Sequence, residues 1–302
     1  MIHFDIIIPT YNNLAELQEC LRGLEHQSLR GFRAIVCVDG STDGTLEWLQ
    51  ATEFGFHLLV LTHPDGKNHG RNPTRNLALP HMNAEYLCFL DSDIIPSPDL
   101  LVRHKQQLDR CDCVSVGDVR YTNSDTNLWA AYAQTRGKNK FNHGDEIPYY
   151  YLATGNCAHR TQHFTTIGGQ DPIITRYGGG DTEYALRLHS ATGIPVYFNK
   201  EAYGTAEMNK DLPTALRQLE EFGETNLHYI HTKHPQETDI FGLRIFTGRT
   251  LAANILRLLL RLPLGMIESI APILPLQLAI KFLNYSVLRR IYRGWLKGIA
   301  NK

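Results

Sequence analysis

Short apolar runs alternate with helical patterns of leucine through the first hundred residues. Each run is rich in large apolar side chains and is followed by a polar residue, which is typical of a buried strand. The four runs are Phe4–Pro9, Arg33–Val38, His57–Thr62 and Glu85–Leu90. Four strand–helix units of this kind predict an α/β fold, with a mostly parallel sheet and helices on both faces.

The segments between these runs have the features of helices and their caps. Leucines recur at helical spacing from residue 14 to residue 24. Asn12 and Asn13 precede them and can cap this first helix, while Asp43 can cap the second. A third, shorter helix is expected around Arg75–Leu79.

The pattern becomes less regular beyond residue 100. It predicts two strands and two helices, at Val114–Val119, Pro195–Asn199, Leu128–Gln134 and Asp181–His189. Glycines mark turns, one of them at Gly155–Asn156. An amphipathic helical pattern begins near Thr250 and continues to the end of the sequence, interrupted by prolines.

Charge is distributed unevenly along the 302 residues. The formal net charge is −1, which gives no reason to expect a nucleic-acid partner. From Arg244 to Lys302, however, ten lysines and arginines accompany a single acid, Glu268. Residues 249–299 therefore form a basic helical extension, and an anionic membrane surface is its expected partner.

The apolar face of this extension has two open interpretations. It could lie in the plane of an anionic bilayer, as basic amphipathic helices do. It could instead pack on the rest of the chain or on a second subunit, as in a homo-oligomer. The charge excess favours the membrane.

Cysteine usage and the start of the chain bear on the compartment. None of the six cysteines forms a C-x-x-C pair, and buried reduced thiols suit the cytosol. Met1 leads directly into an apolar strand without the features of a signal peptide, and no uncharged apolar stretch reaches about 18 residues. We therefore expect a cytoplasmic protein, peripheral on the inner face of the cell membrane.

Two carboxylates follow the fourth predicted strand directly, as Asp91-Ser92-Asp93. Ligands of open α/β sheets bind at the carboxyl ends of the strands. Hard oxygen ligands at such a place suit Mg²⁺ or Mn²⁺, which can bridge a diphosphate. A solvated turn in which Asp93 caps a following helix is an equal interpretation.

Seven short motifs occur in order along the chain, and together they resemble those of family 2 glycosyltransferases. They are PTYNN (Pro9–Asn13), VDGSTDGT (Val38–Thr45), NHGRNPTRN (Asn68–Asn76), FLDSD (Phe89–Asp93), ATGNCAHR (Ala153–Arg160), IGGQD (Ile167–Asp171) and GGGDTEYALRL (Gly178–Leu188). The resemblance spans residues 2–235 and implies the Rossmann-like GT-A fold. It also implies inverting transfer from a nucleotide-activated sugar, usually at the cytosolic side of a bacterial membrane.

The resemblance divides the chain and assigns its donor loops. Residues 1–100 would bind the nucleotide-sugar, residues 101–235 would bind the acceptor and supply the base, and residues 236–302 would be the extension. Pro9, Thr10 and Tyr11 match the loop that holds the nucleoside. Asp39 matches the carboxylate that reads the base, commonly uracil, so a UDP-sugar is the expected donor.

The phosphates and metal are assigned in the same way. Arg75 resembles a residue that contacts the donor phosphates, although a structural ion pair is an equal interpretation. Asp91 would line the ribose or the sugar, and Asp93 would bind the metal. Many relatives have a histidine as a third ligand after the next strand. The corresponding segment here has none, and Glu207 is the nearest candidate.

Asp181 matches the catalytic base of the family, although Gly180 precedes it where Glu is usual. The start of a helix favours the ionised form, which can take a proton from the acceptor hydroxyl. Glu183 could share this role or lie on a solvated helix face. Gly155, Asn156, Gly180 and Glu183 are the residues expected to contact a saccharide or lipid-linked acceptor.

Other classes fit the sequence less well. A dinucleotide-dependent oxidoreductase needs G-x-G-x-x-G after the first strand, where PTYNN stands. A sugar nucleotidyltransferase needs a glycine-rich basic loop there. A catalytically silent relative that binds nucleotide-sugar or scaffolds a membrane assembly stays as the alternative, although Asp93 and Asp181 are both present. The expected function is hexosyl or N-acetylhexosaminyl transfer in cell-surface glycan synthesis.

Overall fold

The structure is a computed structural model that describes residues 2–237, 240, 242–261, 268 and 270–300. The chain forms two compact units. The first, which we call the sheet unit, comprises residues 1–122, 135–175 and 180–207. The second, the helical unit, comprises residues 123–134, 176–179 and 208–302.

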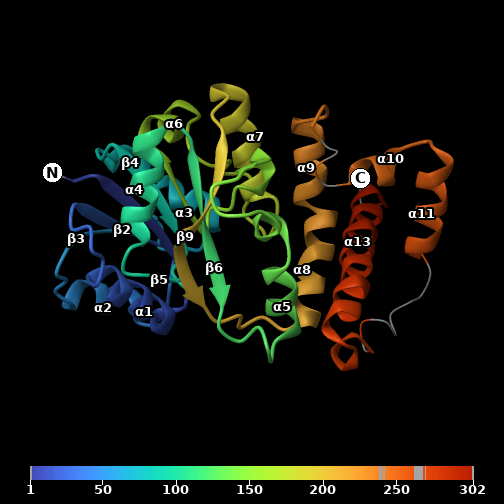
Figure 1. Ribbon diagram of the computed structural model, residues 1–302, viewed down its shortest axis with the longest axis horizontal. Helices are drawn as coiled ribbons and strands as arrows, with labels where there is room; N and C mark the ends of the chain where they lie inside the picture. The colour runs from blue at the N-terminus through green and yellow to red at the C-terminus, as the bar shows by residue number, and fades with distance from the viewer. Residues whose placement is uncertain (1, 238–239, 241, 262–267, 269, 301–302) are drawn as a thin grey trace. The chain divides into compact units, whose positions relative to one another are not determined.

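The sheet unit is built on one continuous, mostly parallel sheet (Figure 1), as predicted. Its strand order is β3-β2-β1-β4-β8-β6-β9-β5, and β7 pairs with β9. The bounds are β1 Phe4–Thr10, β2 Phe32–Val38, β3 His57–Thr62, β4 Tyr86–Leu90, β5 Ile95–Pro96, β6 Val114–Tyr121, β7 Glu146–Ile147, β8 Asn156–Arg160 and β9 Val196–Ala206. The predicted boundary at residue 100 falls inside this sheet, so the division into a donor half and an acceptor half stays a functional prediction.

The strand register brings several loops to one edge of the sheet. β1, β2 and β4 are parallel, so their carboxyl ends meet at what we call the carboxyl edge. β8 runs antiparallel to β4 and pairs Asn156 with Leu90, so it begins at this edge. Asn156 is therefore the first residue of a strand rather than part of the predicted turn.

Helices cover both faces of the sheet, as predicted. Along β1, Ile6 and Ile8 belong to one hydrophobic cluster and Ile7 to another. α1 and α4 contribute to the first cluster, and α6 and α7 to the second. The helices of this unit are α1 Leu14–Glu25, α2 Thr45–Ala51, α3 Arg71–Asn76, η1 Leu79–His81, α4 Leu100–Arg110, η2 Gly137–Lys140, η3 Tyr149–Tyr151, α6 Thr161–Thr166 and α7 Gly180–Thr192.

The predicted caps differ in detail from the observed ones. Asn13 occupies the N-cap position of α1 without a capping hydrogen bond, because its side chain contacts Thr10 and Ser92 instead. Asp43 replaces it: one carboxylate oxygen accepts from the Leu14 N–H at 2.9 Å. The other oxygen accepts from Thr45, the first residue of α2. One carboxylate thus stabilises the starts of two helices.

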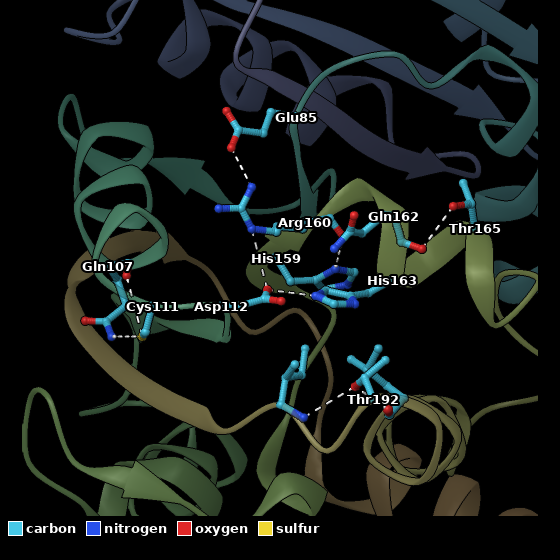
Figure 2. A network of polar contacts seen from close by, with 12 residues as sticks. Glu85, Gln107, Cys111, Asp112, His159, Arg160, Gln162, His163, Thr165 and Thr192 are labelled. Atoms are coloured by element: carbon cyan, nitrogen blue, oxygen red, sulfur yellow. Dashed lines mark hydrogen bonds and ion pairs between the residues drawn. The ribbon is translucent and has the colours of Figure 1, made fainter.

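At the opposite end of β4 lies the amino edge, where charged side chains form a connected series of contacts (Figure 2). Arg160, the last residue of β8, donates to Glu85 at 2.5 Å. It also lies 3.6 Å from Asp112, which is within 2.8 Å of the His163 ring. These side chains tie the start of β4 to the end of β8.

The helical unit confirms the predicted C-terminal helical extension. It contains α5 Leu128–Gln134, α8 Leu212–Glu224, α9 Asn226–Lys233, α10 Leu243–Thr247, α11 Leu251–Arg261, η5 Ala271–Ile273 and α13 Leu276–Ala300. α8 and α13 approach at backbone distance, because a Cβ added to Gly294 would lie 1.9 Å from the Glu220 carbonyl oxygen. Among the described helices, none has both the length and the apolar character needed to cross a membrane.

Candidate active site

The first loop at the carboxyl edge is held in place by its neighbour. Pro9 and Thr10 are buried at the end of β1, whereas the side chain of Tyr11 is 51% exposed. Asn12 has a positive φ of 47°, and its side-chain oxygen accepts from the Thr42 N–H at 2.7 Å. The loop thus presents Tyr11 outward, where an aromatic ring can contact a nucleoside.

Asp39 follows β2 and is 4% exposed. One carboxylate oxygen accepts from the His69 N–H at 2.7 Å, and the other from the Gly70 N–H at 3.0 Å. The His63 ring lies 3.4 Å from the same carboxylate. Asp39 therefore fixes the loop that leads into α3. The role of Asp39 in reading the base stays a prediction. In that role, its carboxylate would accept a hydrogen bond from the base through the lone pairs that His69, Gly70 and His63 leave unused.

Arg75 lies in α3 and is almost completely buried. Its Nη2 donates to Asp91 Oδ1 at 2.6 Å and to the Thr154 carbonyl at 3.4 Å, and its Nη1 donates to Gln170 at 3.3 Å. Its Nε has no hydrogen-bond partner among the described residues. Of the two interpretations of Arg75, the structure contains the ion pair, and that pair holds Asp91 in position.

Of the two carboxylates after β4, Asp91 pairs with Arg75, whereas no described arginine or lysine forms an ion pair with Asp93. The Asp93 side chain is exposed to solvent in the turn that follows β4. Partial desolvation, together with the charge of Asp91, raises the pKa of Asp93 to about 6, and the charge of Arg71 opposes this shift. Asp93 does not cap α4, whose N-cap is Asp99. Like-charged carboxylates held together in this way are typical of functional sites.

The two carboxylates fit a hard divalent cation in part. Mg²⁺ is commonly bound through one or two carboxylates while substrate phosphates and waters complete its shell. β5 and β9 are antiparallel and pair Ile95 with Thr205. If this register continued for two more residues, Glu207 would lie opposite Asp93. Within the described ranges, however, no three His, Cys, Asp or Glu side chains lie close enough to hold a metal ion. The role of Glu207 stays a prediction.

Asp181 lies in the first turn of α7, as predicted, and accepts a short hydrogen bond from the Thr154 hydroxyl. The Thr154 carbonyl also accepts from Arg75. The next residue, Gly155, accepts from the Asp91 N–H at 2.9 Å, and a Cβ there would lie 3.1 Å from Asp91 Oδ2. Asp181 and Asp91 are therefore linked through two adjacent residues, Thr154 and Gly155, which form the turn 154–155.

Glu183 does not lie on a solvated helix face. It is fully buried, and both carboxylate oxygens accept from Arg187 Nε, at 2.8 and 3.0 Å. Arg187 in turn donates to the carbonyls of Ile167 and Gly169. The structure therefore gives Glu183 a packing role, and acceptor contact is not available to its buried carboxylate.

Asn156 is likewise buried and occupied. Its amide donates to the carbonyls of Asp118 and Ala202 at 2.9 Å, and its oxygen lies 2.9 Å from the His104 ring. Burial lowers the pKa of His104 to about 4, so the ring is neutral. Of the four residues expected to contact the acceptor, Gly155 and Gly180 stay as predictions, and Gly180 lies beside Asn72.

Lys138 in η2 is a candidate that the sequence analysis missed. Burial lowers its pKa, and the charges of Asp118, Cys157 and Asp181 oppose this effect. Its ammonium makes no hydrogen bond or ion pair with the residues that the structure describes. Asp118 pairs with Arg120 through Oδ2 at 3.1 Å, while its Oδ1 is buried without a hydrogen-bond partner among the described residues. Nothing local in Gly137–Lys140 signals this placement, since it depends on the packing of distant segments.

These features define a class before any comparison: a Rossmann-like α/β domain of the GT-A type, with paired carboxylates and a helix-opening aspartate at the carboxyl edge. Residues 5–167 match the family profile described as Glycosyl transferase family 2. Since the match covers more than half of the chain, the chain belongs to this family.

Two relatives illustrate the sequence similarity. The chain is 25% identical over 237 residues to YfnE of Bacillus subtilis (strain 168), described as an uncharacterized glycosyltransferase, covering 62% of this chain and 60% of that one. It is 26% identical over 229 residues to validoxylamine A glucosyltransferase of Streptomyces hygroscopicus subsp. jinggangensis (strain 5008), covering 66% and 54%. The chain thus matches only part of the length of these relatives.

Solved structures confirm the fold. TarS 1–349 of Staphylococcus aureus in complex with UDP superposes with a TM-score of 0.60 at 16% identity, covering 100% of this chain and 92% of that one. The mannosyltransferase PcManGT of Pyrobaculum calidifontis, in complex with GDP-Man and Mn²⁺, gives 0.61 at 16% identity, covering 98% and 88%. At this identity the likeness concerns the fold alone.

Proposed function

We propose that this chain is an inverting glycosyltransferase that moves a hexosyl or N-acetylhexosaminyl group from a UDP-sugar. The acceptor is a saccharide or a lipid-linked saccharide of cell-surface glycan synthesis. The observation that carries the proposal is the turn 154–155, which joins the carboxylates after β4 to the aspartate that opens α7. The carboxylates proposed to bind the donor thereby lie next to the proposed base within one unit.

The comparisons support this choice of donor. Relatives of the same fold bind UDP, UDP-GlcNAc, or GDP-Man with Mn²⁺. Asp39 lies at the carboxyl end of β2, where the family resemblance expects a carboxylate that reads uracil. We therefore place UDP-sugars first among donors to test and GDP-sugars second.

Each residue of the site would have a separate role in the reaction. Asp93, beside Asp91, would hold Mg²⁺ or Mn²⁺, which when bound neutralises charge on the leaving diphosphate. Arg75 orients Asp91 through their ion pair. Asp181 accepts the proton of the acceptor hydroxyl as that oxygen forms its bond to the anomeric carbon and the bond to the diphosphate breaks. Because the hydroxyl attacks the face of the anomeric carbon opposite the leaving diphosphate, the anomeric centre is inverted.

A panel of nucleotide-sugars tests the proposal. Thermal unfolding is measured with each donor in the presence of Mn²⁺ and in excess EDTA, and hydrolysis of each stabilising donor is then followed. We expect a UDP-sugar to raise the melting temperature only with metal and to be hydrolysed slowly. The proposal fails if no nucleotide-sugar stabilises the protein, and its metal-dependent part fails if EDTA changes nothing.

A further inference from the structure

The basic extension separates into two parts with different environments. In α13 the charges serve internal packing, because Arg290 pairs with Glu268 and lies 3.0 Å from Glu220. Lys297 lies 2.5 Å from Glu220 as well. Although burial raises it, these cations hold the pKa of Glu220 below its usual value. α13 is therefore a packing helix, in which four of the five cations share two acids, Glu220 and Glu268.

α11 has the opposite arrangement. The side chains that it buries, Ala253 and Leu260, lie on one side. With about 3.6 residues per turn, the opposite side carries large aliphatic residues. These form what we call the α11 face: Leu251, Ile255, Leu258 and Leu259, which are 75%, 51%, 65% and 45% exposed. Of the thirteen exposed large hydrophobic residues in the described ranges, eight lie between residues 251 and 278, so the concentration is local.

The charges that flank the α11 face have one sign. Arg249 precedes α11, Arg261 is its last residue, and both are exposed. The one acid of residues 244–302 is Glu268, which Arg290 already engages. Arg257 differs from these two arginines because its guanidinium donates hydrogen bonds to the carbonyls of Phe246 and Gly248. An apolar face with an arginine at each end is thus directed to solvent.

We infer that the α11 face docks the protein on an anionic lipid bilayer, with α11 in the plane of the interface. Eleven residues are too few to span a bilayer, so the helix lies along it. A second copy fits this face less well, because pairing it with itself in either direction brings arginine against arginine. The inference does not depend on the proposed catalytic activity.

Vesicle co-sedimentation of the full chain tests the inference. Vesicles of phosphatidylglycerol and phosphatidylcholine are compared with phosphatidylcholine alone, at low and high salt. We expect binding to the anionic vesicles that high salt weakens. The double variant Ile255→Ser/Leu258→Ser should weaken it about tenfold or more, since both side chains lose their apolar surface. Replacing Arg249 and Arg261 by Gln should weaken it about fivefold for each charge.

Matched variants elsewhere give the control. Ile173→Ser removes an isoleucine of similar exposure, 64%, and Arg110→Gln removes an exposed arginine of the sheet unit. Both should bind vesicles like the unaltered chain, and melting temperatures check that every variant is folded. The inference is overturned if the intact chain stays in the supernatant, or if the α11 variants bind as the controls do. It is also overturned if light scattering finds a dimer that Ile255→Ser/Leu258→Ser dissociates, because a second copy then covers the face.

Discussion

The two ends of β4 carry similar charged residues in opposite situations. At the amino edge, Glu85 precedes the strand and Arg160 neutralises it, in a network that also contains Asp112 and His163 (Figure 2). At the carboxyl edge, Asp91 has Arg75 as partner, while Asp93 keeps a raised pKa beside it. The same strand therefore ends in balanced charge on one side and in an excess of negative charge on the other.

The comparison shows where the protein leaves interactions for a ligand. Each charged member of the amino-edge network has an opposite charge within about 4 Å, which is the range of an ion pair. At the carboxyl edge Asp118 pairs with Arg120 at 3.1 Å, but its second oxygen is buried without a hydrogen-bond partner, and Lys138 has no ion pair among the described residues. Polar groups without a partner cost stability and are typical of functional sites, which favours the carboxyl edge as the functional side of the sheet.

The largest expected effect is the loss of the unbalanced carboxylate. Asp93→Ala should abolish both transfer and metal-dependent donor binding while the fold is retained, because the metal loses its protein ligand. Glu85→Gln, at the other end of the same strand, should leave activity unchanged. Transfer assays and donor-induced thermal shifts measure both variants. Full activity of the unaltered chain in excess EDTA would contradict the metal's role.

Asp181→Asn should lower turnover by roughly 10²–10⁴-fold, the usual contribution of general-base catalysis. The amide keeps the size of the side chain and can still accept a hydrogen bond from Thr154, so donor affinity should change little. Steady-state kinetics and the anomeric configuration of the product are the measurements. A product that retains the configuration of the donor, or near-normal turnover, would refute this assignment.

Lys138→Met should lower activity about tenfold or more, the scale of one charged hydrogen bond to substrate. Lys138→Arg should restore part of it. Lys140→Met is the matched control, because Lys140 is exposed in the same short helix. Equal kinetics for the Lys138 and Lys140 methionine variants would show that the Lys138 ammonium does not contact the substrate.

Protonation of Asp93 should appear in two pH dependences of opposite sign. Its pKa of about 6 lies above the ordinary value, so the carboxyl is neutral below pH 6 and metal-dependent UDP binding should weaken there. Without metal, the ionised form costs stability above that pH. Asp93→Asn should therefore raise the melting temperature at pH 8, with the difference fading toward pH 4. A lower melting temperature at pH 8 would contradict the raised pKa.

The smallest effect is expected at the amino edge. Asp112→Asn removes contacts to Arg160 and His163 from a half-exposed position, where solvent screening limits the loss to about 1 kcal/mol or less. The melting temperature should fall by only a few degrees, and transfer should be unaffected. A large loss of activity would show that the two edges are coupled.

The sequence predicted β1 to β4 well because β1, β2 and β4 are buried on both faces, while the edge strand β3 is still partly buried. Such burial leaves continuous apolar runs, and the predicted bounds of β1 to β4 differ from the observed ones by at most one residue. β8 was missed because it contains a buried asparagine and histidine, Asn156 and His159, which read locally as a polar turn. Their partners come from distant segments, which periodicity cannot reveal.

The candidate site shows the same limit. The carboxylates at strand ends were predictable because parallel strands must end at one edge. The buried pair of Glu183 with Arg187 was not, since a polar residue in an amphipathic helix normally faces water. The tail is a further case: α11 and α13 have similar patterns of apolar and basic residues, yet α11 buries two side chains, whereas α13 buries eight residues between Ala279 and Gly298.

The turn 154–155 has a thermodynamic consequence. Thr154 contacts both Arg75 and Asp181, and Gly155 contacts Asp91, so neither substrate can shift its own side of the turn without shifting the other. Linkage then requires reciprocity: whatever factor a bound donor applies to acceptor affinity, the acceptor applies to donor affinity. The affinity for each substrate would then depend on whether the other is already bound, by the same factor whichever of the two arrives first.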